Sequence, residues 1–77
     1  MTEKTKTTKE ELALRNRIIG LLLRDARERA EKTKRECATA LGVSTGTITA
    51  YEEGRKSISL PELETLAYVT DTPPSHF

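Results

Sequence analysis

Apolar residues recur at intervals of three and four along the first half of the chain, which is the spacing of a helix that buries one side. The stripe consists of Leu12, Ile19, Leu22, Leu23, Ala26 and Ala30. Thr8 and Glu11 precede it in the pattern of a capping box, in which each side chain binds the other residue's backbone N–H. The pattern therefore predicts a helix from about Lys9 to Ala30.

Two short helices follow, with an abrupt break at Gly42. Thr33 and Glu36 form a second capping box and open a helix that runs to Leu41. Gly42 ends this helix, because glycine readily adopts the left-handed conformation found after helix C-termini. A short turn containing glycine joins two helices at a steep angle. We therefore expect the next helix to cross this one sharply.

The third helix is predicted from Ser44 to Glu53, with the Ser44 side chain as its N-cap. Its residues Ile48 and Tyr51 are expected to face the core. The opposite side carries only small or hydroxyl-bearing residues: Thr45, Gly46, Thr49 and Ala50. Threonine and glycine are poor helix formers, so helix stability alone does not account for their use here.

A fourth helix begins at a third capping box, formed by Ser59 and Glu62. It continues to about Thr70 and is broken by Pro73 and Pro74. A fifth, short element can begin at Pro74. Because no alternating strand pattern and no internal repeat occur, the chain is predicted to be all-α, with four to five short helices.

The composition is that of one small domain. The chain has 77 residues, of which 35% are hydrophobic, and no tryptophan. The single Cys37 excludes a disulfide within the chain, and no Cys/His spacing typical of a metal site occurs. No apolar run is long enough to cross a membrane. We expect a cytoplasmic protein without metal or cofactor.

The polar start of the chain lacks any apolar period. Residues 1–8 are therefore predicted to be a flexible arm, and residues 9–77 to form the domain, either complete or as part of a longer protein. All 13 basic residues lie within residues 1–56, against nine acidic ones, which leaves +4 there and −3 in residues 57–77. Any anion-binding surface should therefore lie in the first two thirds.

The turn motif has a recognisable register. Beginning at Lys34, a set of residues recurs at spacings that resemble those of the DNA-binding helix-turn-helix of the phage-repressor (Cro/XRE-like) family: Ala38, Gly42, Val43, Ile48 and Tyr51. The resemblance covers roughly residues 19–70. This range includes the segment Tyr51-Glu52-x-Gly54-Arg55 and the fourth helix. The resemblance implies a lambda-repressor-like fold and double-stranded DNA binding by a bacterial or phage transcriptional regulator, with residues 44–53 in the major groove.

The resemblance also implies site residues. Base contacts would come from the outward face of the third helix: Thr45, Gly46, Thr49 and Ala50. Phosphate contacts would come from Lys34, Ser44, Thr47, Arg55 and Lys56. Small side chains permit close approach to a groove, and methyl groups can meet thymine methyls. The alternative is a merely exposed helix face beside solvated loop charges.

Two residues outside the motif have an implied structural role. In the family, an arginine at the position of Arg27 pairs with a glutamate at that of Glu52 and ties the first helix to the recognition helix. The alternative is two independent surface charges. This chain departs from the family pattern in two ways: Lys34 stands where a glutamine is common, and positions 45–47 lack long polar side chains.

A second apolar stripe lies on the first helix, offset from the buried one. Leu14, Ile18 and Leu21 recur at intervals of four and three residues and so share a face. Such a face is covered either by another subunit or by a domain downstream in a longer protein. The alternative is that it packs on the chain's own C-terminal residues near Phe77.

Other classes of function stay open at this stage. A helix-turn-helix can also serve as a protein-interaction module of a larger bacterial protein, which the near-neutral charge and weak base-contact set favour. A generic helical bundle is a further alternative. An enzyme is not expected, because the sequence shows neither a nucleophile–base set nor a glycine-rich phosphate loop.

Overall fold

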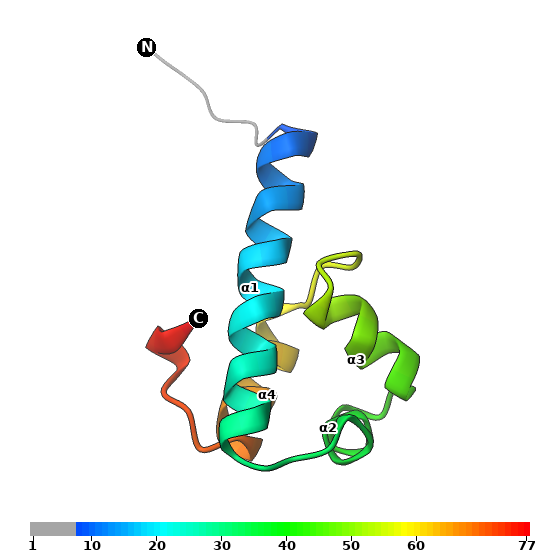
Figure 1. Cartoon of the computed structure of the whole chain (residues 1–77), viewed down its shortest axis with the longest axis vertical. Coiled ribbons are helices and arrows are strands. Elements are labelled where there is room, and N and C mark those ends of the chain that lie inside the picture. Colours follow the sequence, from blue (N-terminus) through cyan, green and yellow to red (C-terminus); the bar gives the residue numbers. More distant parts are fainter. Residues whose placement is uncertain (1–7) are drawn as a thin grey trace.

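The computed structural model describes residues 8–77 (Figure 1). It contains the helices α1 (Lys9–Arg29), α2 (Lys34–Leu41), α3 (Thr45–Glu52) and α4 (Leu60–Val69), and a short 3₁₀ turn, η1 (Pro74–His76). No strand occurs within this range, so the predicted all-α class is confirmed. Of the arm expected at residues 1–8, all but Thr8 lies outside the described residues.

The helix boundaries follow local chemistry. All three predicted capping boxes are present, at the starts of α1, α2 and α4. Gly42 ends α2 in the left-handed conformation, with a φ angle of 70°. The chain also turns left-handed after α1 and α4, at Glu31 (φ 57°) and Asp71 (φ 52°). Because these two residues are not glycine, neither turn could be predicted from its residue type.

Helix α1 is the longest helix. Helices α2 and α3 lie on one side of it, and the C-terminal segment lies on the other (Figure 1). Helix α3 packs against α1 and α2, and α2 also packs against α4. The crossing of α1 and α3 requires Gly20, because a Cβ atom there would overlap the carbonyl oxygens of Tyr51 and Glu52. Glycine thus sets how closely α3 approaches α1.

The core is small and aliphatic. Its buried members are Leu23, Cys37, Ala38, Ile48, Tyr51 and Leu66. Burial raises the pKa of the Cys37 thiol, so this cysteine behaves as a small core hydrophobe. The expectation that Leu12 joins the buried stripe is wrong: it is 44% exposed. The first turns of α1 extend beyond the helices that would cover them (Figure 1).

Candidate nucleic-acid interface

The turn from α2 into α3 places the four predicted base-contact residues on one side of α3. Thr45 and Gly46 are exposed, and Thr49 and Ala50 are half-buried. The opposite side of the helix is buried through Ile48, which packs in the core. The structure therefore presents a smooth face of small side chains, bounded by the N-terminus of α3.

The N-terminus of α3 differs from those of the other three α-helices. Each of those carries a capping-box glutamate in its first turn: Glu11, Glu36 and Glu62. Helix α3 has no acidic residue there. Its N-cap Ser44 accepts a hydrogen bond from the Thr47 N–H at 3.2 Å, and the two hydroxyl oxygens lie 3.1 Å apart. No carboxylate in the first turn of α3 offsets the positive end of its dipole.

The capping-box glutamates are held in their charged form. Hydrogen bonds at the cap lower the pKa of Glu11 and Glu36 from the ordinary value of 4.5. Partial burial acts to raise the pKa of Glu62, but hydrogen bonds from Ser59 and Tyr51 outweigh it, and this pKa is lowered too. The Tyr51 hydroxyl donates to Glu62 at 3.0 Å and joins α3 to α4. Sequence reasoning did not find this link.

Gly46 has no packing role among residues 8–77. A Cβ atom at this position would meet only the Ser44 side-chain oxygen, at 3.7 Å. Glycine in a helix interior is less favourable than alanine by about 1 kcal/mol. The small size of Gly46 is therefore not explained by the fold of the described residues.

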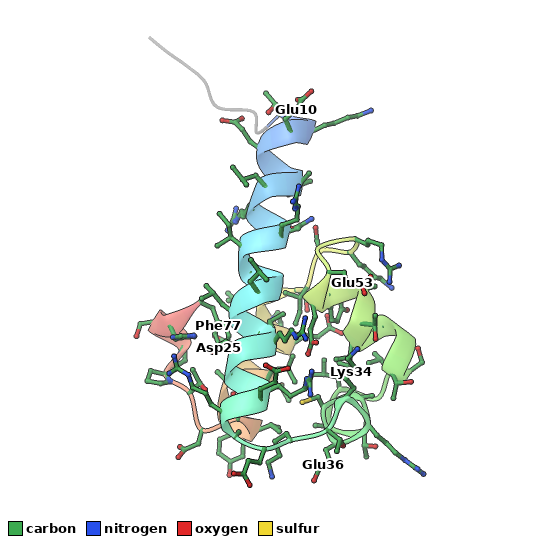
Figure 2. All side chains as sticks on the ribbon, viewed as in Figure 1. Glu10, Asp25, Lys34, Glu36, Glu53 and Phe77 are labelled. Atoms are coloured by element: carbon green, nitrogen blue, oxygen red, sulfur yellow. The ribbon has the colours of Figure 1, made fainter. Side chains whose placement is uncertain are left out.

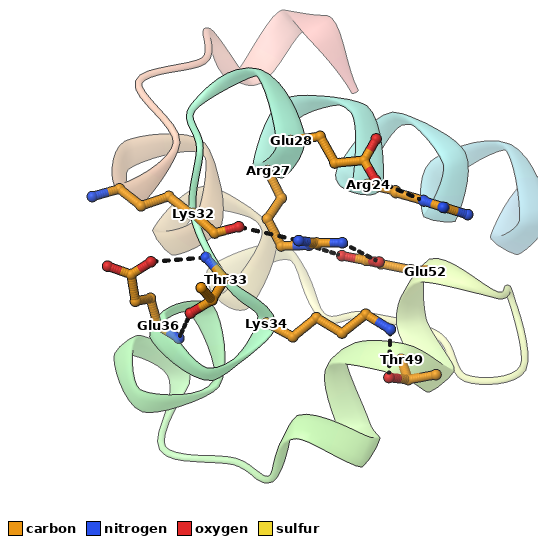
Figure 3. A network of polar contacts seen from close by, with 9 residues as sticks. All are labelled: Arg24, Arg27, Glu28, Lys32, Thr33, Lys34, Glu36, Thr49 and Glu52. Atoms are coloured by element: carbon orange, nitrogen blue, oxygen red, sulfur yellow. Dashed lines mark hydrogen bonds and ion pairs between the residues drawn. The ribbon is translucent and has the colours of Figure 1, made fainter.

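Lys34 contacts the face of α3 directly. Its side chain reaches from the start of α2 to α3, where Nζ donates to Thr49 Oγ1 at 3.0 Å (Figure 3). The residue is half-buried. A residue expected to bind phosphate is thus joined to one expected to contact a base, and the sequence did not predict this contact.

The loop after α3 carries the other expected phosphate-binding residues. Arg55 and Lys56 are both exposed. Arg55 Nε lies 2.9 Å from Glu53 Oε1 in an exposed ion pair. The Arg55 charge is therefore partly offset by Glu53, a contact that was not predicted.

The pair expected between Arg27 and Glu52 is present. Arg27 Nε donates to Glu52 Oε2 at 2.6 Å, and Nη2 donates to Oε1 at 3.2 Å (Figure 3). The two side chains are only 13% and 6% exposed. Arg27 Nη1 also donates to the Lys32 carbonyl at 3.1 Å, and the hydrogen bond with Glu52 raises the Arg27 pKa. This network fixes the C-terminal end of α3 against α1 and the loop into α2.

The interior offers little room for a bound molecule. The cavity beside Cys37, Ile48 and Phe77 has a volume of about 10 Å³, which holds one water molecule at most. Within residues 8–77 no three side chains of the His, Cys, Asp or Glu types come together as a metal site would require. No helix in that range has the length and apolar character needed to cross a membrane.

Comparison with known proteins agrees with this geometry. A family model described as a helix-turn-helix domain matches residues 18–76, which include all of α2, the turn, α3 and α4. No curated protein matches the sequence significantly. The matched range covers most of the chain and contains the sharp turn at Gly42 and the α3 face. The chain therefore belongs to the helix-turn-helix domain family.

Proposed function

We propose that the chain is a double-stranded DNA-binding module of a bacterial or phage transcriptional regulator, of the phage-repressor (Cro/XRE-like) class. Helix α3 would lie in the major groove. The observation that carries the proposal is the small-residue face of α3. No packing contact in the described part of the chain requires glycine at position 46, and the first turn of α3 lacks an acidic residue. Both features favour the close approach of a polyanion.

The roles of individual residues follow from position. Base edges would be met by the α3 face and phosphates by residues around it. The proposed base contacts are Thr45, Gly46, Thr49 and Ala50, and the proposed phosphate contacts are Lys34, Ser44, Thr47, Arg55 and Lys56. The module would act in the cytoplasm as a binding protein, not as an enzyme, and would need no cofactor.

Titration with labelled duplex DNA at about 50 and 200 mM salt tests the proposal. Binding through several phosphate contacts releases counterions, so affinity must fall steeply between these conditions. Duplexes enriched from a random library should bind more tightly than a scrambled duplex if base contacts contribute. Binding that is absent, or that does not change with salt, would contradict the proposal.

A protein-interaction module is the second candidate. The exposed pairing of Arg55 with Glu53 and the net charge of +1 favour it, since both reduce attraction to phosphate. The same titration separates the two functions, because an interaction module of this kind would show no salt-dependent affinity for duplex DNA.

We also propose that the second apolar stripe of α1 forms a homodimer. Leu14, Ile18 and Leu21 are 58%, 49% and 65% exposed, so the chain's own C-terminal residues do not bury them. A groove beside the stripe is lined by Leu14, Ile18, Leu60, Leu63 and Phe77, among others. Apolar side chains that gather on an exposed helix face beside a groove are typical of an interaction site.

The position of the groove suits a two-fold DNA-binding dimer. Figure 2 shows Phe77 on the side of α1 opposite α3. The molecule spans 24 Å in the direction that runs from that side to α3. Two copies joined there would span about twice this width. The α3 axes lie about one helix radius, roughly 5 Å, inside each outer edge, so they would be up to roughly 38 Å apart. Half-sites one DNA turn apart require about 34 Å.

Sedimentation at increasing protein concentration tests the dimer. We expect a monomer–dimer equilibrium for the parent and a monomer for Ile18→Lys, with the helical spectrum unchanged. Thr65→Lys, on α4 and outside the groove, is a control for the added charge. A parent that stays monomeric at every concentration would contradict the dimer and favour a domain downstream in a longer protein as the occupant of the groove.

A further inference from the structure

The hydrogen bond between Lys34 and Thr49 has a fixed direction. A lysine ammonium group carries three donors and no acceptor. The Thr49 hydroxyl oxygen must therefore accept from Lys34 Nζ, at 3.0 Å. Both residues are half-buried, so the bond is partly shielded from water.

Thr49 differs from Thr65, in α4, and Thr70, the C-cap of α4, whose hydroxyl groups donate to backbone carbonyls of that helix. The hydroxyl of Thr65 donates to the Pro61 carbonyl at 3.0 Å, and that of Thr70 donates to the Leu66 carbonyl at 2.7 Å. These are the usual bonds of a threonine to its own helix. The Thr49 hydroxyl makes no such bond within residues 8–77, where its only hydrogen bond is the one from Lys34.

We propose that Lys34 sets Thr49 as a hydrogen-bond donor toward the DNA bases. The cation polarises the hydroxyl group, which strengthens its proton as a donor and weakens its oxygen as an acceptor. This inference rests on the proposed function, in which the α3 face lies in the major groove. Lys34 is then a positioning residue for base recognition, and its remaining donors stay available for a phosphate.

The direction of the Thr49 hydrogen bond determines which bases Thr49 can contact. In the major groove the purines offer N7, guanine also offers O6 and thymine offers O4, all of which are acceptors. Cytosine offers only its N4 amino donor there. A Thr49 hydroxyl held as a donor therefore discriminates against cytosine on the strand that it faces.

Selection of duplexes from a random library, with each variant, tests this assignment. The parent should enrich sites that exclude cytosine at one position. Thr49→Val, which has the same shape without the hydroxyl, should accept all four bases there and bind the parent's site about 3- to 10-fold more weakly. Thr49→Ser should keep the exclusion.

Lys34→Met and Lys56→Met form a matched pair, because each removes one charge. We expect each substitution to lower the magnitude of the salt slope by about one. Only Lys34→Met should also admit cytosine at the position affected by Thr49→Val. If both variants weaken all sequences equally, Lys34 is only a phosphate contact; the inference then fails while the proposed function stands.

A measurement on the free protein tests the bond without DNA. In ¹⁵N spectra of the lysine ammonium groups, we expect Lys34 to exchange protons with water more slowly than Lys56. Thr49→Val should remove that difference, and its persistence would overturn the inference. Salt-independent or absent DNA binding by the parent would overturn the proposed function and the inference with it.

Discussion

Replacement of Gly46 by alanine should stabilise the protein. A Cβ atom at this position would meet only the Ser44 side-chain oxygen, at an ordinary contact distance of 3.7 Å. The substitution removes the helix penalty of glycine, about 1 kcal/mol in a helix interior and less near its start. A gain of about 0.5–1 kcal/mol corresponds to a rise in melting temperature of about 2–8 °C for a domain of this size.

Gly20→Ala is the matched control and should have the opposite sign. Its new Cβ atom would overlap the backbone carbonyl oxygens of Tyr51 and Glu52, so α1 and α3 must separate. Overpacking of this kind costs about 1–3 kcal/mol. Thermal melts followed by circular dichroism measure both variants. A lower melting temperature for Gly46→Ala would contradict the open surroundings assigned to this residue.

For Gly46→Ala, we expect the affinity for DNA to fall although the thermal stability rises. The added methyl group stands where α3 is proposed to approach the groove, and even about 1 kcal/mol of steric cost lowers the affinity about 5-fold. Fluorescence anisotropy of a labelled duplex measures this. A variant that melts higher than the parent yet binds equally well would refute the assignment of Gly46 to the contact surface.

The helices were predictable because their signals are local. Each capping box places its threonine or serine three residues before its glutamate, so Thr8, Thr33 and Ser59 mark helix starts in the sequence alone. The ends of α1 and α4 were also predicted to within one residue, at Ala30 and Thr70. The left-handed turns that follow them, at Glu31 and Asp71, were not predicted, because neither residue is glycine. Local backbone hydrogen bonds close these turns, from the Lys32 N–H to the Arg27 carbonyl and from the Thr72 N–H to the Ala67 carbonyl.

The candidate site was predicted as a set of residues but not as a set of contacts. The Arg27–Glu52 pair followed from the family resemblance, whereas the bonds from Lys34 to Thr49 and from Tyr51 to Glu62 did not. Those bonds depend on how α2 crosses α3 and on how α3 lies against α4. Spacing along the chain does not give these angles to within the reach of a hydrogen bond.

Three further predictions concern stability and binding. Arg27→Met should lower the free energy of unfolding in urea by about 3–5 kcal/mol, because it leaves the Glu52 carboxylate buried without its partner; Arg27→Met with Glu52→Leu should recover part of this loss. The capping-box glutamates have lowered pKa values, so the stability that they contribute should be present above pH 4.5 and lost as pH falls below it. Replacing all three by glutamine should make the melting temperature less dependent on pH in this acid range, and an unchanged dependence would contradict this. Thr45→Ala and Ala50→Glu should fold like the parent but bind duplex DNA more weakly, with Ala50→Glu weaker because of phosphate repulsion; parent-like affinity of Ala50→Glu would exclude this face.

The most direct test of the central claim is a map of the backbone amides that respond to DNA. The ¹⁵N-labelled chain would be titrated with a duplex enriched from a random library, and amide shifts would be followed residue by residue. We expect the changes to concentrate at the N-termini of α2 and α3, along the outward face of α3 and at Arg55 and Lys56, with little change over α4. Changes confined to the groove beside Leu14 and Phe77, or no changes at saturating DNA, would contradict the assignment of α3 as the DNA-binding surface.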